Sequence, residues 1–140
     1  MRFLVDANVV LYSAVPSPYQ GPCRQVLRAV ASGQAQGSMS TAAMEEVWHL
    51  ELSGRAGPLE GLTRRAYEVF APLLPVTDDA FQYALNLAAP GVGANDRLHA
   101  AICSAHGIPV ICSADAGFDG VPGLRRVDPL DGPGLQRMLG

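Results

Sequence analysis

Short apolar runs alternate with longer amphipathic stretches along this chain. Residues Arg2–Asp6 form a β-rich run that ends in an acid. Ile108–Cys112 form a second run that is short and continuously apolar, as in a strand buried on both faces of a parallel sheet. Further short strands are expected at Gln36–Ser40 and Leu124–Val127.

Helices are expected between these runs, where apolar residues recur at helical spacing. The predicted helices span Pro22–Ala31, Leu59–Leu73 and a segment from Ala94 or Asn95 to His106, with a final helical turn at Leu135–Leu139. Two more helices start at capping residues: one runs from Ser40 or Thr41 to Ser53, and the other runs from Thr77 and ends before Pro90. Strands that alternate with helices indicate a three-layer α/β/α domain with a mostly parallel sheet. Sites in such sheets form beyond the carboxyl ends of the strands.

The length and composition predict one domain that spans residues 1–140, with 49% hydrophobic residues to fill its core. We expect a cytoplasmic protein, because no apolar run is long enough to cross a bilayer and the N-terminus lacks the pattern of a signal peptide. The three cysteines have no C-x-x-C spacing, which disfavours zinc and disulfides.

The charge of the chain does not by itself indicate a nucleic-acid protein. The net charge is −3, all ten basic residues are Arg, and Lys is absent. A local patch can still hold phosphate. The missing Lys excludes a response-regulator receiver, which needs one beside its phosphoryl group.

Acidic residues follow two predicted strands and open one predicted helix. Asp6 ends the first run, and Asn8 lies two residues after it. Asp115 and Asp119 follow the run at Ile108–Cys112. Asp96 lies in the first turn of a predicted helix. Carboxylates that converge at strand ends commonly hold divalent cations. The pattern indicates metal-assisted hydrolysis, with a phosphodiester as the expected substrate.

Each acid also has a structural interpretation. Asp6 can cap the turn after its strand with Asn8 as its local partner, and Asp96 is favoured by the helix dipole. Asp115 and Asp119 can belong to an ordinary acidic loop. A fourth candidate lies on the helix before Ser53, where periodicity leaves Glu45 and Glu46 equivalent, both at the border of an apolar face.

Three histidines are the remaining candidates for acid–base chemistry. His49, His99 and His106 share no short metal-ligand spacing, and we interpret all three as structural.

Taken together, these motifs resemble those of PIN-domain ribonucleases, in particular the VapC-type toxins of toxin–antitoxin pairs. The run F-L-V-D-A-N-V-V-L resembles the family's first strand, with Asp-x-Asn and then an apolar helix start. The run S-T-A-A-M-E-E-V resembles a helix with Glu six residues after Ser, which selects Glu46. N-D-R-L-H-A-A places Asp96, and V-I-C-S-A-D-A-G-F-D places Asp115, with Asp119 as an additional acid.

The resemblance implies a PIN-like sheet of about five strands and a ribonuclease that depends on Mg²⁺ or Mn²⁺. It implies cleavage of single-stranded or structured RNA, including tRNA, a homodimer and a small antitoxin partner. The catalytic and metal-binding residues it implies are Asp6, Glu46, Asp96 and Asp115, with Asp119 as a further metal ligand and Asn8 in support. Few basic side chains are then available to RNA: Arg64, Arg65, Arg97, Arg125 and Arg126.

Two alternatives belong to other classes. A haloacid-dehalogenase-type phosphatase needs Asp-x-Asp on its first strand, where this chain has Asp-Ala-Asn. A PIN-like adaptor without catalytic activity would lack one of the acids, and none is missing.

Overall fold

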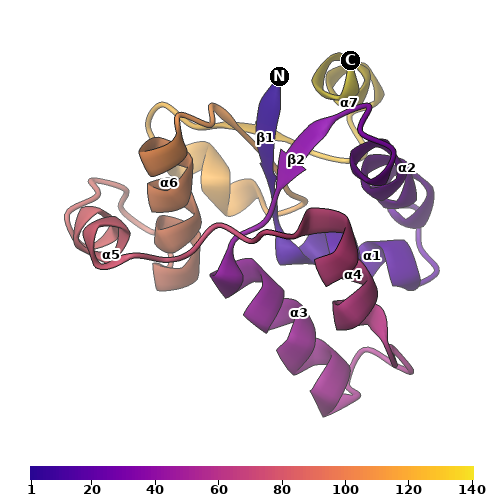
Figure 1. Cartoon of the computed structure of the whole chain (residues 1–140). Coiled ribbons are helices and arrows are strands. Elements are labelled where there is room, and N and C mark those ends of the chain that lie inside the picture. The colour runs from indigo at the N-terminus through magenta and orange to yellow at the C-terminus, as the bar shows by residue number, and fades with distance from the viewer.

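A parallel sheet of four strands forms the centre of the computed structural model, which describes residues 1–140 (Figure 1). The strands are β1 (Arg2–Val5), β2 (Gln36–Ser38), β3 (Val110–Cys112) and β4 (Arg125–Val127), in the order β2-β1-β3-β4. The first strand is therefore internal, as expected for a strand that carries a site residue at its end.

The fifth strand expected from the family resemblance is reduced to one bridge. Leu74 pairs with Ser40 beyond the edge strand β2, and the Leu74 N–H donates to the Met39 carbonyl at 2.9 Å. Pro72 and Pro75 flank this bridge, and proline has no N–H to extend a ladder. The expectation of about five strands is therefore corrected to four.

Helices cover both faces of the sheet (Figure 1). On one face lie α5 and α6, together with the short 3₁₀ helix η1; the other five helices pack with the opposite face. The bounds of the helices are α1 Ala7–Ala14, α2 Gln20–Ala31, α3 Thr41–Ser53, α4 Leu62–Phe70, α5 Asp78–Leu85, α6 Ala94–His106, η1 Ala116–Gly120 and α7 Gly132–Leu139.

Two hydrophobic cores result from the alternation of side chains along the strands. Phe3 and Val5 of β1 belong to the core with α1–α4 and α7, whereas Leu4 belongs to the core with α5 and α6. In β3, Ile111 joins Leu4 while its neighbours join the other core. The three-layer α/β/α arrangement is confirmed.

The predicted caps of two helices are confirmed. Ser40 accepts from the Ala43 N–H at 3.1 Å to cap α3, and Thr77 accepts from the Ala80 N–H at 3.2 Å to cap α5. Helix α4 is shorter than predicted, because it begins after Gly61, a left-handed residue with φ of 81°.

Helix α5 ends at Leu85, before the predicted position, and the segment that follows it is bound by Arg97. Its guanidinium donates to the carbonyls of Leu87, Ala89 and Val92, which lie in the segment between α5 and α6. These carbonyls are thereby satisfied without a helix. Arg97 is bound to its own chain, so it is not a free RNA contact.

No helix in the structure has both the length and the apolar character that a membrane span requires.

Candidate metal centre

Asp6 is buried where β1 ends, at the carboxyl edge of the sheet. Its N–H donates to the Cys112 carbonyl at 3.0 Å, which extends the pairing of β1 with β3. Its Oδ1 accepts a 2.7 Å hydrogen bond from the Ala7 N–H and so caps α1. The capping interpretation of Asp6 is confirmed, and the same carboxylate is part of a larger cluster.

Ser113 and Asn8 fix the other oxygen of the Asp6 carboxylate. The Ser113 hydroxyl donates to Asp6 Oδ2 at 2.7 Å, and the Asn8 amide donates to the same oxygen at 3.2 Å. Ser113 Oγ also accepts from the Asp115 N–H at 2.9 Å, and Asn8 Oδ1 accepts from the Ala114 N–H at 3.3 Å. These bonds hold the loop after β3 against the loop after β1.

Asp96 and Asp115 approach each other from the starts of α6 and η1. Asp115 Oδ1 accepts from the Gly117 N–H at 2.8 Å. A Cβ atom on Gly117 would lie only 3.0 Å from Asp115 Oδ1 and 3.5 Å from Asp96 Oδ2. The absence of a side chain at Gly117 therefore leaves room for both carboxylates against η1.

Glu46 reaches the same region from α3. Its Oε2 accepts a 3.1 Å hydrogen bond from the Asn95 side-chain amide at the start of α6. Glu45 and Glu46 are both exposed residues, but only Glu46 belongs to the group of side chains that gathers here. The structure thus separates two glutamates that helical periodicity leaves equivalent.

His99 lies among these acids and is almost completely buried, with 1% of its surface exposed. Its Nε2 lies 3.6 Å from Asp6 Oδ1 and 3.3 Å from Asn95 Nδ2, while its Nδ1 has no hydrogen-bond partner. Burial lowers the pKa of His99, and the Asp6 carboxylate offsets part of that effect. Asp6, Glu46 and His99 each offer one potential ligand atom, and these three atoms all lie within 4.8 Å of one another.

The electrostatics of the cluster disfavour full ionisation. Burial, followed by the charge of Asp115, raises the pKa of Asp96 to about 7, and Asp6 and Glu46 add to the effect. Partial burial of the carboxylate and the charge of Asp6 also raise the pKa of Glu46, against a hydrogen bond from Asn95 that lowers it. We refer to Asp6, Glu46, Asp96 and Asp115 as the acidic cluster.

A divalent cation fits the chemistry of this donor set. None of the ion pairs in the structure joins an Arg to the acidic cluster. Clustered carboxylates without a cationic partner repel one another, and oxygen donors of this kind are those that Mg²⁺ and Mn²⁺ take.

Asp119 has a different environment. Both of its oxygens accept from Arg126, at 3.0 Å and 3.2 Å, in a bidentate pair that lowers the pKa of Asp119. Arg126 also donates to Asp128 at 3.0 Å. Asp119 is exposed, and Arg126 is occupied by two carboxylates of its own chain.

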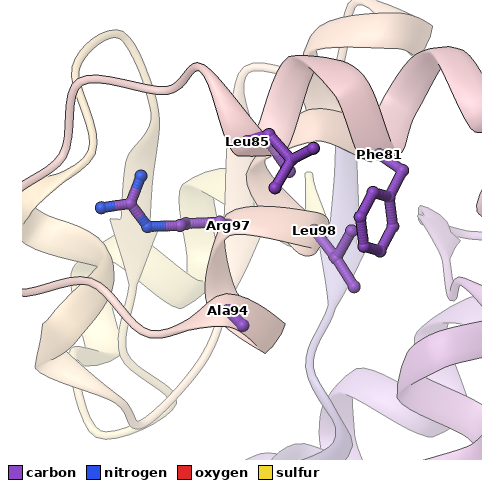
Figure 2. A pocket seen from close by; sticks show the side chains of 6 residues that line it. Phe81, Leu85, Ala94, Arg97 and Leu98 are labelled. Carbon is purple, nitrogen blue, oxygen red and sulfur yellow. The ribbon is translucent and has the colours of Figure 1, made fainter.

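The most apolar surface pocket is not at the acids. It lies between α5 and α6 and is lined by Phe81, Ala84, Leu85, Ala94, Arg97 and Leu98. Figure 2 shows the side chains of Phe81 and Leu98 close together, with the Arg97 guanidinium turned away from them. This pocket offers no carboxylate or imidazole for hydrolytic chemistry.

Sequence patterns do not identify two of the residues beside the acidic cluster, His99 and Ser113. His99 follows Asn95 by one helical turn, but no spacing marks it as a partner of Asp6. Ser113 precedes Asp115 by two residues and resembles an ordinary loop serine. Only a register that aligns the ends of β1 and β3 could have identified Ser113 in advance.

Comparison with known proteins agrees with this architecture. A family model described as "PIN domain" matches residues 3–124. Two relatives, VapC ribonuclease Mb1869c of Mycobacterium bovis and ribonuclease VapC13 of Mycobacterium tuberculosis, are each 26% identical over 128 residues. The alignments cover 89% of this chain and 98% of each relative.

Solved structures share the fold at lower identity. FitAcB of Neisseria gonorrhoeae has a TM-score of 0.70 and 18% identity, with 92% of this chain and 99% of that chain covered. VapBC2 of Rickettsia felis, bound to a DNA fragment from its promoter, has a TM-score of 0.67 and 14% identity, with 91% and 98% covered.

Proposed function

Because the chain belongs to the PIN-domain family, we propose that it is a metal-dependent endoribonuclease and the toxin of a type II toxin–antitoxin pair. The observation that carries the proposal is the gathering of four carboxylates from α3, α6 and the ends of β1 and β3, in a chain related to VapC ribonucleases.

The acidic cluster would hold Mg²⁺ or Mn²⁺ through Asp6, Glu46, Asp96 and Asp115. When bound, such an ion makes a water nucleophilic and stabilises charge that develops on phosphate oxygens. Asp119 is left out of this set, because Arg126 takes both of its oxygens.

The remaining polar residues orient the acids. Ser113 and Asn8 hold one Asp6 oxygen, and Asn95 holds one oxygen of Glu46. Asp96, with its pKa raised to about 7, is only partly ionised near neutral pH and would release its remaining proton when a cation binds. These contacts preorganise the carboxylates at the edge of the sheet.

The substrate in this proposal is RNA, either single-stranded or structured and including tRNA, as the names of the VapC relatives suggest. Arg64, Arg65 and Arg125 are exposed and can contact phosphates, whereas Arg97 and Arg126 are bound within the chain. For such a substrate we propose a cytoplasmic location.

A small antitoxin is the proposed protein partner, because solved structures with this fold include a VapBC complex. We also propose a homodimer. The product of the neighbouring reading frame, co-expressed with this chain, should co-purify with it and suppress its cleavage of RNA. Size-exclusion chromatography with light scattering should show a dimer of the chain alone.

The test of the enzymatic proposal is incubation of the purified chain with labelled RNAs, including tRNA, in Mg²⁺, in Mn²⁺ and in EDTA. We expect internal cleavage that requires the cation, is lost in Asp6→Asn and is absent on DNA of the same sequence. Equal cleavage by the parent and Asp6→Asn would contradict the proposal. The absence of any cleavage with bound cation would favour the adaptor alternative.

A further inference from the structure

We infer that His99 supplies a nitrogen ligand to the cation held by Asp6 and Glu46, and that this mixed set of donors prefers Mn²⁺ to Mg²⁺. The inference rests on the proposed function, because it concerns the cation of the same acidic cluster. Its starting point is a ring nitrogen that lies among carboxylate oxygens in a buried position.

The position of the ring suits a shared cation. His99 Nε2 lies 3.6 Å from Asp6 Oδ1, and donor atoms of these two residues and Glu46 are all within 4.8 Å of one another. Atoms that ligate one ion at about 2.0–2.2 Å are separated by distances of this order or less. Asp6 follows β1, Glu46 lies on α3 and His99 lies on α6, so the three donor atoms converge from separate segments.

The hydrogen-bond network assigns the tautomer of His99. The Asn95 amide nitrogen only donates, and it lies 3.1 Å from Glu46 Oε2 and 3.3 Å from His99 Nε2. An amide turned the other way would place its oxygen against the Glu46 carboxylate. We therefore assign a lone pair to Nε2 and the ring proton to Nδ1.

This tautomer leaves an unmatched contact inside the cluster. With no proton on Nε2, no hydrogen lies between it and Asp6 Oδ1, 3.6 Å away, and its single lone pair meets only the 3.3 Å contact from the Asn95 amide. A neutral imidazole with a free nitrogen is the form that binds metals. A cation placed between the two atoms would satisfy both and would replace the contact of Nε2 with the Asn95 amide, which keeps its bond to Glu46.

The ring is held by packing rather than by a partner at its other nitrogen. Nδ1 is buried without an acceptor. The His99 ring packs against Phe118 instead, with ring centroids 6.1 Å apart. Most metal-binding histidines are oriented through the second nitrogen; here burial and Phe118 have that role.

The donor set decides the metal preference. Mg²⁺ is a hard ion that takes oxygen ligands and keeps several waters, whereas first-row transition metals also take imidazole. Exchanging an oxygen ligand for a nitrogen therefore favours Mn²⁺ over Mg²⁺. A site of four carboxylates alone would discriminate less between the two ions.

The direct test is electron spin-echo modulation of Mn²⁺ bound to the full chain, which detects a directly coordinated ring nitrogen. We expect ¹⁴N modulation that changes to the ¹⁵N pattern when the histidines are ¹⁵N-labelled. The variants His49→Gln and His106→Gln should keep the signal, because neither side chain belongs to the cluster. These experiments need no change at the buried His99.

A second test compares affinities by calorimetry with MnCl₂ and MgCl₂. The loss of a ligand in His99→Gln should weaken Mn²⁺ binding by about 10-fold or more, since even partners of ligands cost about 10–100-fold. Mg²⁺ binding should change much less, so the Mn²⁺:Mg²⁺ preference of the parent should shrink.

The outcomes separate this inference from the proposed function. Bound Mn²⁺ without ring-nitrogen modulation, together with cation-dependent RNA cleavage, would overturn the role of His99 and leave the ribonuclease proposal intact. Ring-nitrogen modulation without cleavage of any RNA would support the ligand and contradict the ribonuclease. The absence of binding by either cation would overturn both.

Discussion

The hydroxyl of Ser113 donates a 2.7 Å hydrogen bond to Asp6 Oδ2, although the two residues are 107 positions apart in the chain. Both are buried, and they follow the paired strands β3 and β1. The register places Val5 opposite Cys112, so the residues that follow these two face each other. This bond joins the end of one strand to a carboxylate at the end of the other.

Ser113→Ala should destabilise the chain. The substitution removes the Ser113 donor to Asp6 Oδ2, which then keeps only the 3.2 Å bond from Asn8, and it removes the acceptor of the Asp115 N–H. We expect a loss of about 1–3 kcal/mol in the free energy of unfolding, measured by urea denaturation in EDTA. The control is Ser104→Ala, at an exposed position of α6. Equal stability of the two variants would contradict this role of Ser113.

Asp96→Asn should stabilise the metal-free chain at pH 8. Folded Asp96 takes up its proton at a pKa of about 7, whereas the unfolded residue does so near ~3.9. Its contribution to stability is therefore complete below pH ~4 and is lost as the pH rises through the folded pKa. Removing the charge should recover on the order of 1–2 kcal/mol at pH 8, after allowance for solvent screening of a partly exposed group.

Thermal melting in EDTA between pH 4 and 8 measures this effect. The parent and Asp96→Asn should converge at the acidic end and separate at the alkaline end. Asp79→Asn, in the exposed first turn of α5, serves as the control and should show no such divergence. A lower melting temperature of Asp96→Asn at pH 8 would show that its charge is not destabilising.

Asp115 and Asp119 should respond differently to substitution. Asp115 adjoins Asp96 in the acidic cluster, while Asp119 is paired with Arg126. We expect Asp115→Asn to reduce the rise in melting temperature that MnCl₂ produces, because a cation that binds only the folded chain stabilises it. Asp119→Asn should keep the full rise. A reduced rise in Asp119→Asn with a normal one in Asp115→Asn would reverse the assignment.

Local sequence signals predicted the strands and much of the helical structure. Ser40 and Thr77 carry capping side chains that act within their own helix, so their effect does not depend on tertiary packing. Asp6 was identifiable because it ends an apolar run. The prediction of a fifth strand was wrong, because Pro72 and Pro75 limit backbone pairing at Leu74 to one bridge.

The rest of the site depends on contacts between distant segments. The family resemblance selects Glu46 over Glu45 by its spacing from Ser40, but the contact that holds Glu46 comes from Asn95, which lies 49 residues further along the chain. His99 meets Asp6 only because α6 packs on the sheet beside β1. Asp119 is removed from the cluster by Arg126, a partner that no local motif indicates. The periodicity of a single helix or strand contains none of this information.

The most direct measurement of the central claim compares Glu46→Gln with Glu45→Gln in the cleavage of labelled RNA with MnCl₂ or MgCl₂. The two substitutions are chemically identical and lie on adjacent positions of α3, but only Glu46 belongs to the acidic cluster. We predict that Glu46→Gln loses cation-dependent cleavage by a factor of about 100 or more, as the removal of a key charge stabiliser does, while Glu45→Gln retains the activity of the parent. Parental activity in Glu46→Gln would contradict the account.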